Sequence, residues 1–581
     1  MREISYPFFL FSILLLAILS TLFPILNLLQ MDLTKTHPGW FSHTYPIFFI
    51  GWLLGLMSCS QPTNVETALK DQVLHFGLGA EPQHLDPHLA TSVAAHNVLT
   101  ALLEGLVSED PETLQPRPGV AESWSISDDG LIYTFKLREE GQWSNGDPVT
   151  AGDFIYSFRR ILNPNFGAKY ASMLYPLKNA SLYHEGLTSW EDAQVGAESI
   201  DPYTLQLTLE NPVPYFLQLL NHYSWFPVHP PTIEKFGAFE KMGTSWTKSG
   251  NFVGNGPFTL FNHQINSVIE VTKNPHYWDQ KTVRLNGIRF YPIEAVYTEE
   301  RAYRTGFLHL TQSVSADRID FLKQKYPQDL HFEPYLGTYF YRFNLKSPPF
   351  DDLRVRQAFS LAIDRQKLVD KVLKGGQAPA TSFTPPGTGG FYPKSSFHYD
   401  PTKAQALLQS YLKDKGLGKL PPIELTYNTS EGHKKVAEAL HGMWKDVLGI
   451  EIQLLNMEWK VFLSTVSKGD FTLARAGWIG DYVDPNTFLH MWRSGESLNM
   501  TGWENPLYDQ ALQNAQKSGQ EEQRWQSFQD CEDLLAKEVP ILPLYFYVHL
   551  TLRHPTVQGW HPTLLDHHPY KYVYLSEEET P

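Results

Sequence analysis

The stretch Tyr133-Thr-Phe-Lys-Leu-Arg-Glu-Glu-Gly-Gln-Trp-Ser-Asn-Gly-Asp-Pro-Val-Thr-Ala151 carries the strongest indication of the fold. Its beginning, with Leu131 before it, alternates apolar and polar side chains with a period of two, which is typical of a half-buried strand. The segment from Tyr203 to Leu209 repeats this alternation between Asp201-Pro202 and Asn211-Pro212. Both segments are therefore predicted to be strands.

Helical patterns appear further along the chain. Asp351-Asp352 can cap a helix in which four apolar residues share one face: Val355, Ala358, Phe359 and Ala362. The next segment groups apolar residues on one face in the same way and is predicted to stop at Gly375-Gly376. Because strand and helix patterns alternate irregularly, we predict a mixed α/β fold of several domains.

Length and composition limit the class of protein. The 581 residues are 42% hydrophobic and 19% charged, which excludes a disordered or coiled-coil chain. Acidic side chains outnumber basic ones by 62 to 47, and the formal net charge is −15. A phosphate backbone would be repelled by that average field, so we expect no nucleic-acid partner.

The two cysteines cannot build a disulfide framework or a thiolate zinc site. Cys531 lies in a helical-looking segment, Phe528 to Lys537, and is predicted to be buried. Cys59 ends an apolar run, and Leu56-Met57-Ser58-Cys59 resembles the box at which bacterial lipoproteins are cleaved and acylated. We therefore expect residues 1–58 to form a signal region and Cys59 to become a lipid-modified N-terminus.

A second apolar stretch, from Pro7 to Leu29, precedes this run. Its 23 residues could cross a membrane, but two export segments in series are unusual, so we favour Met31 as the start of translation. The alternatives are a transmembrane helix ahead of the box, or an ordinary cysteine in a membrane segment. The chain after Cys59 has no apolar run of membrane length, and we expect its body to be soluble and outside the cytoplasm.

Enzyme motifs are missing from the sequence: it has no Gly-x-Ser-x-Gly elbow and no Gly-x4-Gly-Lys-Ser/Thr loop. The stretch Gly250–Gly256 lacks the lysine of a phosphate loop and is predicted to be a turn. His84-Leu-Asp-Pro-His88 has metal-like spacing, but its proline disfavours a shared helical face, so we predict no metal site. His567-His568 is predicted to lie in a solvated loop. A glycosidase pair of carboxylates needs no local signature and stays open.

Several segments in a constant order resemble one family. They are Gly79–His88, Leu103–Leu106, Pro118–Trp124 and 133–154. In this order and spacing they resemble the oligopeptide-binding proteins of ABC importers, a large extracytoplasmic solute-binding family, from about residue 75 to 575. The similarity to oligopeptide binders in particular rests on 427–435, 458–462 and Ala474–Tyr482.

The resemblance implies an α/β periplasmic-binding-protein fold of class II, in its large three-domain form, with a ligand cleft between two lobes. Domain I would be discontinuous and comprise 75–93, 230–336 and 550–575. Domain II would be 94–229, and domain III, the opposing lobe, would be 337–549. Opening and closing about hinge strands would present the loaded protein to a membrane permease.

The resemblance also implies the charged contacts to a ligand. Asp481 resembles the family aspartate that pairs with a peptide α-amino group. Arg475 and His433, with nearby lysines, resemble the cations that meet the peptide carboxylate. Glu81 is the next candidate for the amine if Asp481 is not its anchor. A short peptide carries both charges, and burying either without a partner is costly.

Three aromatic residues resemble the walls of the family's hydrated side-chain pockets: Trp459, Trp478 and Tyr170. Core packing is the alternative role for each of them. Gly477 begins a segment that would supply main-chain groups to a peptide held as an added strand, together with Glu81–Gln83 and Tyr545–Tyr547.

The sequence departs from the family pattern at several positions. Cysteines that some members pair are absent at Gly337 and Ile479, and a family lysine aligns with Ser347. Val466 stands where a pocket arginine can occur, and Arg342 stands where an acidic pocket residue can occur. Because the pockets are charged differently, the peptide preference of a relative does not transfer to this chain.

The resemblance implies no reaction, no cofactor and no metal. We expect short peptides and ABC permease subunits as partners, a membrane anchor through lipid on Cys59, and a monomer in the periplasm or cell envelope. A second hypothesis keeps the fold but changes the ligand to a murein peptide, a dipeptide, a nickel chelate or an oligosaccharide. A third is a secreted hydrolase, which would need paired acids or a triad in one cleft.

Overall fold

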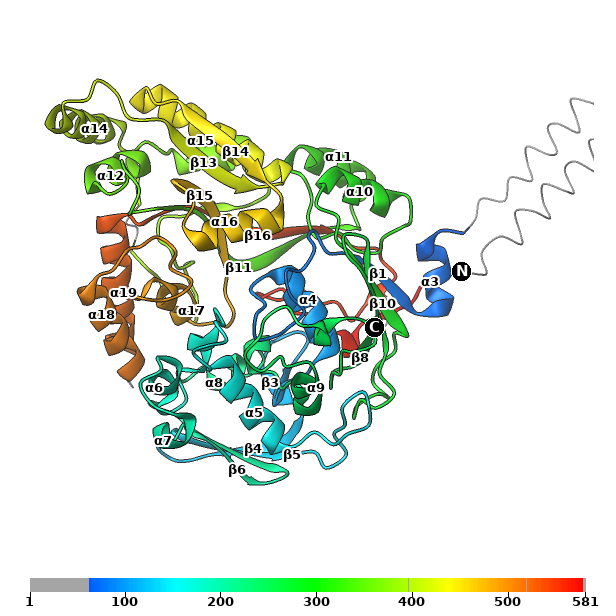
Figure 1. Cartoon of the computed structure of the whole chain (residues 1–581). Helices are drawn as coiled ribbons and strands as arrows, with labels where there is room; N and C mark the ends of the chain where they lie inside the picture. Colours follow the sequence, from blue (N-terminus) through cyan, green and yellow to red (C-terminus); the bar gives the residue numbers. More distant parts are fainter. Residues whose placement is uncertain (1–61, 395–396, 519, 578–581) are drawn as a thin grey trace, which may run out of the picture. The chain divides into compact units, whose positions relative to one another are not determined.

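A computed structural model describes residues 62–394, 397–518 and 520–577 (Figure 1). From Thr63 onward the chain forms one compact unit. The predicted signal region, the stretch from Pro7 to Leu29 and Cys59 lie outside the described residues. None of the helices in these described ranges is long and apolar enough to cross a membrane.

The stretch from Tyr133 to Ala151 folds into a strand, a loop and the start of a helix. β5 (Ile132–Leu137) buries every second side chain, beginning with Tyr133, as its alternation predicts. Further on, the Asp153 carboxylate accepts hydrogen bonds from the Trp143 indole N–H at 3.1 Å and the Thr150 backbone N–H at 2.9 Å. These bonds tie the loop to the first turn of α5 (Ala151–Ile161) and supply one of its free N-terminal donors with a partner.

Two four-stranded sheets build what we call the first lobe. One is antiparallel, with the order β4-β5-β7-β6, and the other has the order β1-β10-β9-β8, with β1 parallel to β10. The strands are β1 (Val73–Gly77), β4 (Ala121–Ile126), β6 (Ala197–Asp201), β7 (Thr204–Thr208), β8 (Phe258–Gln264), β9 (Val268–Lys273) and β10 (Gly287–Tyr291). The helices, besides α5, are α3 (Asn64–Asp71), α4 (Val93–Leu102), α6 (Ala180–His184), α7 (Trp190–Ala193), α8 (Phe216–Leu219), α9 (Pro230–Lys235), α10 (Val296–Arg304) and α11 (Ile319–Lys325).

A mixed six-stranded sheet builds the second lobe, with the order β12-β16-β11-β15-β13-β14. Its strands are β11 (Leu330–Phe343), β12 (Ala378–Pro379), β13 (Ile423–Asn428), β14 (Ile452–Met457), β15 (Leu473–Ile479) and β16 (Ile541–Leu552). Its helices are α12 (Leu353–Leu361), α13 (Arg365–Leu368), α14 (Pro401–Lys415), α15 (Glu431–Leu448), α16 (Trp459–Lys468), α17 (Asn486–Leu489), α18 (Pro506–Lys517) and α19 (Glu521–Glu538). Two small pairs complete the described strands: β2 (Val107–Glu109) with β3 (Pro116–Pro118), and β17 (Val557–Gln558) with β18 (Tyr574–Leu575).

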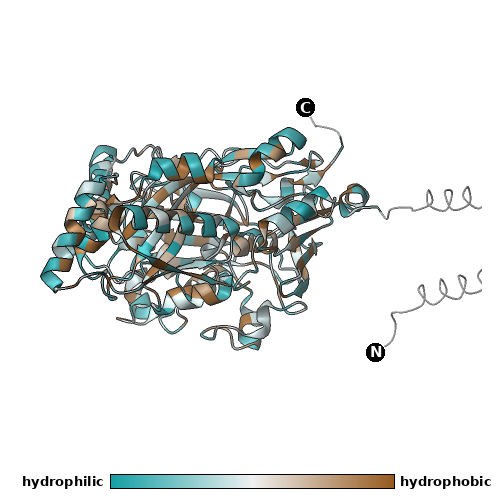
Figure 2. Cartoon of the chain, turned by 90° about the horizontal axis from the view of Figure 1, so that it is seen from above, coloured by the Kyte–Doolittle hydropathy of each residue, from teal (hydrophilic) through white to brown (hydrophobic). Residues whose placement is uncertain are grey.

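The hydrophobic cores follow this division into lobes. One large cluster unites both sheets of the first lobe, from Ala68 to Leu310 and again near Val573. Two other clusters fill the second lobe, one around Phe359 and Trp444 and one around Trp492. Hydrophilic residues lie on the outward faces of the surface helices (Figure 2). We keep the three-domain boundaries as a proposal.

Two long strands connect the lobes. β11 and β16 pair antiparallel from Leu330–Leu552 to Arg342–Ile541, and the register shifts between Pro334 and Thr338. Leu330 and Leu552 pack in a small cluster with first-lobe residues, whereas the other ends of both strands belong to the second-lobe sheet (Figure 1). A bulge bends a strand pair locally, so this segment is the natural place for a hinge.

The predicted helices are present. Asp352 caps α12 by accepting a hydrogen bond from the Arg354 N–H. The following segment is a short α-helix that continues as a π-helical turn and stops at Lys374, one residue before the predicted glycines, where φ is +56°. Cys531 lies inside α19 and is fully buried, as predicted.

The prediction of a solvated loop at His567-His568 is wrong. The two side chains are only 12% and 5% exposed. His567 lies 3.0 Å from a Glu109 oxygen, and His568 lies 2.8 Å from an Asp566 oxygen. These carboxylates replace water as partners of the rings, which makes their burial possible.

The segment His84–His88 has a role in holding the fold together, because Asp86 forms a double ion pair with buried Arg160, at 2.6 and 3.0 Å.

Candidate functional site: a charged cleft between the lobes

A cavity of about 430 Å³ lies between the two lobes. The first lobe lines it with the start of α4 and with the segments around Tyr170 and His222. The second lobe lines it with parts of β11, β15 and α16. Seven of the eight ligand residues expected from the sequence line this cavity: Asp481, Arg475, His433, Trp459, Trp478, Tyr170 and Gly477.

One edge of β15 is open beside this cavity. On one side β15 pairs with β11 along its whole length, from Leu473 to Ile479. On the other side β13 pairs only with Leu473 and Ala474. Within the described part of the chain, Arg475–Ile479 therefore has no strand neighbour on that side. Such an edge offers backbone donors and acceptors to an extended peptide.

Asp481 follows the open edge and carries a carboxylate that is largely buried. Its side chain is 13% exposed, and its Oδ1 lies 3.4 Å from His222 Nε2. Its Oδ2 is buried without a hydrogen-bond partner among the described residues. His222 Nδ1 accepts from the Ser224 N–H, which favours the tautomer with its ring proton on Nε2. This Nε2 also has no hydrogen-bond partner among the described residues, so a donor from a ligand would supply the carboxylate with the partner it lacks.

Aromatic rings of the first lobe enclose the same carboxylate. Tyr170 packs against His222, Tyr223 and Trp478, with ring centroids 4.9, 6.0 and 6.3 Å apart. Burial, and then the charge of Asp481, raise the pKa of Tyr170 and of Tyr223 well above the usual value. Both hydroxyls therefore stay protonated and neutral near this site.

Arg475 lies in β15, on the amino-terminal side of Asp481 along the open edge. Its Nη2 donates to the Tyr547 hydroxyl at 2.9 Å, and its guanidinium carbon lies 4.8 Å from the centre of the Tyr339 ring. Its Nε is buried without a partner, and within the described ranges no carboxylate forms an ion pair with it. Tyrosines and the Asn428 side chain, 3.4 Å from Nη1, thus orient the cation, which has no counterion among the described residues.

His433 lies near Arg475, at the start of α15. Its Nδ1 is 3.3 Å from the Tyr339 hydroxyl. Burial, and then the charge of Arg475, hold the pKa of His433 well below its usual value. The imidazole is therefore neutral at pH 7 in the ligand-free protein. His433 can form hydrogen bonds to a ligand, whereas Arg475 can also contribute a positive charge.

Gly477 lies beside the contact between Arg475 and Tyr547, whereas Trp459 packs against a neighbour in α16. A Cβ atom at Gly477 would lie 2.6 Å from the Tyr547 hydroxyl and 3.0 Å from Arg475 Nη2, so a larger residue here would displace the Tyr547–Arg475 contact. Trp459 stacks on Phe462 in α16, with centroids 6.1 Å apart, and its indole N–H is buried without a partner.

Glu81 is the one expected ligand residue that does not line the cavity. His263 Nε2 lies 2.8 Å from one of its oxygens, and the Asn266 N–H donates to the other at 3.0 Å. Although burial opposes it, these hydrogen bonds hold the pKa of Glu81 below its usual value. The carboxylate thus holds the turn between β8 and β9, and its neighbours Ala80 and Gln83 line the cavity instead.

The structure adds residues that sequence reasoning missed. His222, Tyr223, Lys169 and the side chain of Tyr547 line the cavity, but no local pattern marks them. Arg342 is the exception, because it stands out as a departure from the family pattern, and it lines the same cavity.

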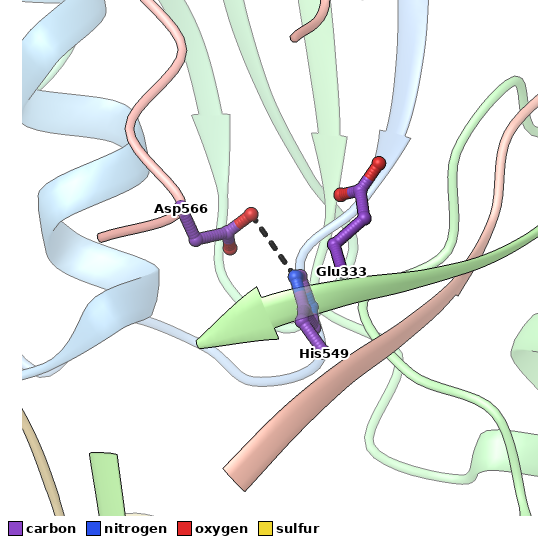
Figure 3. A group of neighbouring side chains, drawn as sticks. All are labelled: Glu333, His549 and Asp566. Atoms are coloured by element: carbon purple, nitrogen blue, oxygen red, sulfur yellow. Dashed lines mark ion pairs between the residues drawn. The ribbon is translucent and has the colours of Figure 1, made fainter. Parts of the chain in front are cut away.

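Glu333, His549 and Asp566 form a second charged cluster where β11 and β16 cross between the lobes (Figure 3). Their ligand-type atoms lie within 4.8 Å of one another. However, His549 Nδ1 pairs with Asp566 at 3.0 Å while its Nε2 donates to the Gln312 carbonyl at 2.9 Å. Burial alone would lower the pKa of His549, but Asp566 raises it to about 9. Both ring nitrogens are thus engaged, and the Glu333 carboxylate pairs with Arg553 at 2.8 Å, so we assign this cluster an ion-pair role.

The lobes are closed on each other. Tyr215 of the first lobe stacks on Tyr482 of the second, with centroids 4.5 Å apart. The Ser497 hydroxyl donates to the Lys169 carbonyl across the cleft at 2.8 Å. A closed cleft with an open strand edge, a buried carboxylate and buried cations defines a class of protein: the two-lobed solute-binding proteins.

The comparison with known proteins identifies the family. Residues 115–499 match the middle part of the bacterial extracellular solute-binding proteins, family 5, and this chain belongs to that family. It is 38% identical to the periplasmic oligopeptide-binding protein OppA of Escherichia coli, over 87% of this chain and 92% of that protein. It is 36% identical to the periplasmic murein peptide-binding protein MppA of the same organism, over 86% and 92%.

Solved structures agree with the fold and with the closed lobes. The Haemophilus influenzae OppA complex with the peptide RPPGFSPFR gives a TM-score of 0.81 at 36% identity, covering 87% of this chain and 99% of that one. Escherichia coli MppA gives 0.82 at 33% identity, with the same coverage. The unliganded open form of MppA gives only 0.58, at 34% identity over 87% and 98%. The family fold predicted from the sequence is therefore confirmed.

Proposed function

We propose that this protein captures short peptides in the cleft between its lobes and delivers them to an ABC permease for import. The observation that carries the proposal is the pairing of a buried carboxylate at Asp481 with an uncompensated cation at Arg475, beside an open strand edge. A peptide has an ammonium group, a carboxylate and a backbone between them, so its groups match all three features. Relatives that bind peptides and serve ABC importers support it.

We infer the direction of the peptide from the same residues. Its ammonium would meet Asp481, which follows β15, and its carboxylate would lie toward Arg475, near the start of that strand. The peptide would therefore run antiparallel to β15. Backbone pairing does not depend on side chains, which allows varied sequences to bind.

We propose that binding and release are the whole activity, without a chemical reaction. The relatives are solute-binding proteins, and closure of the lobes is the step that such a protein has to perform. We further propose that Cys59 carries a lipid that anchors a monomer at the cell envelope. The support is the sequence of the signal box and the periplasmic location stated in the names of the relatives.

Mass spectrometry and calorimetry together test the proposal. Native mass spectrometry of the purified protein is expected to release co-purifying peptides of a few residues. Titration calorimetry with unmodified peptides of two to five residues is expected to show binding that weakens when the amine is acetylated. A co-purifying ligand that is not a peptide, together with no heat of binding for any peptide, would show that the cleft serves another solute.

A further inference from the structure

The cavity contains more cationic side chains than a neutral peptide can satisfy. Arg475, Arg342 and Lys169 all line it, and within the described ranges none of the three forms an ion pair with a carboxylate. The acidic groups in its wall are Asp481 and Asp566, and Asp566 is already paired with His549. The peptide ammonium would pair with Asp481, and the peptide carboxylate would pair with one of the three cations. Two cationic side chains would then remain unpaired in the cavity wall.

Arg342 is the most buried of these cations. Its residue is 9% exposed, and among the described residues its Nε is buried without a partner and its one hydrogen bond is long, 3.5 Å from Nη1 to the Leu498 carbonyl. Burial, and then the nearby charge of Arg475, lower the pKa of Arg342 to about 10. Burial and the charge of Arg342 also lower the pKa of Lys169. The guanidinium stays charged at pH 7 and has no counterion in the part of the chain that the structure describes.

Other buried arginines of this protein show that Arg342 is exceptional. Arg356 donates to the carbonyls of Phe350 and Glu538 at 2.8 to 3.0 Å, and Arg365 donates to the Pro543 carbonyl at 2.6 Å. In these two structural arginines, backbone carbonyl oxygens thus accept the hydrogen bonds of the guanidinium. The Arg342 guanidinium lacks carbonyl acceptors at such distances among the described residues. Its remaining N–H groups are therefore free to donate to a ligand.

The sheet separates Arg342 from Arg475. Arg342 pairs with Ala474 in the β11–β15 register, whereas Arg475 pairs with Tyr341. Paired residues point to the same face and successive residues to opposite faces, so the two cations serve opposite faces of a strand added at the open edge. On the Arg342 face of β15, Ala474 is buried in the core, whereas Ala476 lines the cavity with a small side chain.

We propose that Arg342, assisted by Lys169, binds a second carboxylate of the ligand, so that this protein prefers peptides with an acidic side chain toward their carboxyl-terminal end. The inference rests on the proposed function and specifies its substrate class. Arg475 remains the partner of the terminal carboxylate. The two arginines therefore recognise two different anionic groups of one peptide.

Calorimetry with a scanned peptide set tests this assignment. Tetrapeptides that carry a single Glu or Gln at each position in turn are compared, as free acids and as C-terminal amides. Wild type is expected to bind the best Glu peptide about ten- to a hundredfold more tightly than its Gln counterpart, the range of a charged hydrogen bond. In Arg342→Met this Glu/Gln ratio should fall toward one while the acid/amide ratio persists. Arg475→Met is the matched variant and should show the reverse pattern.

Further measurements separate binding from folding. Arg342→Met should melt at or above the wild-type temperature without ligand, because it removes an uncompensated buried cation. Arg342→Lys keeps the charge and should retain part of the Glu/Gln ratio. A wild type that binds peptides with equal affinity for Glu and Gln at every position would overturn this inference and leave the proposed function standing. A wild type that binds no peptide at all would overturn both.

Discussion

Replacing Asp481 with asparagine tests the anchor of the peptide amine. The Asp481 carboxylate makes few contacts within the protein: Oδ1 is 3.4 Å from His222 Nε2, and Oδ2 has no partner among the described residues. The carboxylate that bonds to the start of the following short helix, α17, belongs to Asp484, whose Oδ1 accepts from the Asn486 N–H at 2.9 Å. Asp481→Asn should therefore leave the melting temperature of the ligand-free protein nearly unchanged.

The effect on affinity should be large. At an effective dielectric constant of about 20, two unit charges about 4 Å apart attract by about 4 kcal/mol. Removing one partner of a buried charge pair typically costs about 3–5 kcal/mol. Because each 1.4 kcal/mol is about a tenfold change in affinity, Asp481→Asn should weaken binding of a free-amine tetrapeptide by about a hundred- to several thousandfold.

Titration calorimetry with a free-amine peptide and its N-acetylated form measures this effect. Wild type should discriminate strongly between the two, and Asp481→Asn should bind both weakly and to a similar extent. Asp470→Asn is a suitable control, because Asp470 is exposed at the end of α16, away from the cavity. If Asp481→Asn retains wild-type affinity for the free amine, the electrostatic argument for this anchor is refuted.

Three further perturbations test other parts of the argument. Arg475→Met should weaken binding of free-acid peptides about ten- to a hundredfold and remove the difference between free acids and amides in calorimetry; an unchanged difference would point to another cation. Cys59→Ser should move the protein from the membrane to the soluble fraction of disrupted cells, and a variant that still needs detergent would favour a retained anchor at 7–29. Asp566 raises the pKa of His549 from 6.5 to about 9 against the effect of burial, so their ion pair should stabilise the fold fully below about pH 6.5 and lose its effect as the pH rises through 9. The wild-type melting temperature should accordingly fall from about pH 7 to about pH 10, and it should fall less in His549→Gln; equal slopes would argue against this linkage.

Much of the fold could be predicted because its signals are local. The alternation in 131–137 depends only on which side chains face the core, and β5 buries those residues. The asparagine, glycine, aspartate and proline that follow are turn residues by their own backbone preferences. Asp481 was proposed on different grounds, because it resembles a family aspartate in a motif that directly follows a strand.

Predictions about single polar side chains were less secure, because the partner of a polar group can come from any part of the chain. His567 and His568 look solvated in sequence, yet Glu109 and Asp566 allow them to be buried. Glu81 belongs to a family motif, but its carboxylate is engaged by His263 and a backbone N–H. No pattern in the neighbouring sequence reports these partners.

The amino-acid sequence was sufficient to predict the α/β elements and the order of the family motifs, since each depends on residues close together in the chain, and the resemblance to the family supplied the candidate anchors. Which charges are compensated depends on the tertiary structure. It brings His222 to Asp481 and, among the residues that the structure describes, leaves Arg342 and Arg475 buried without a carboxylate. The physical reason is that the free energy of a buried charge depends on everything within a few ångströms of it, and those neighbours meet only when the two lobes have folded and closed.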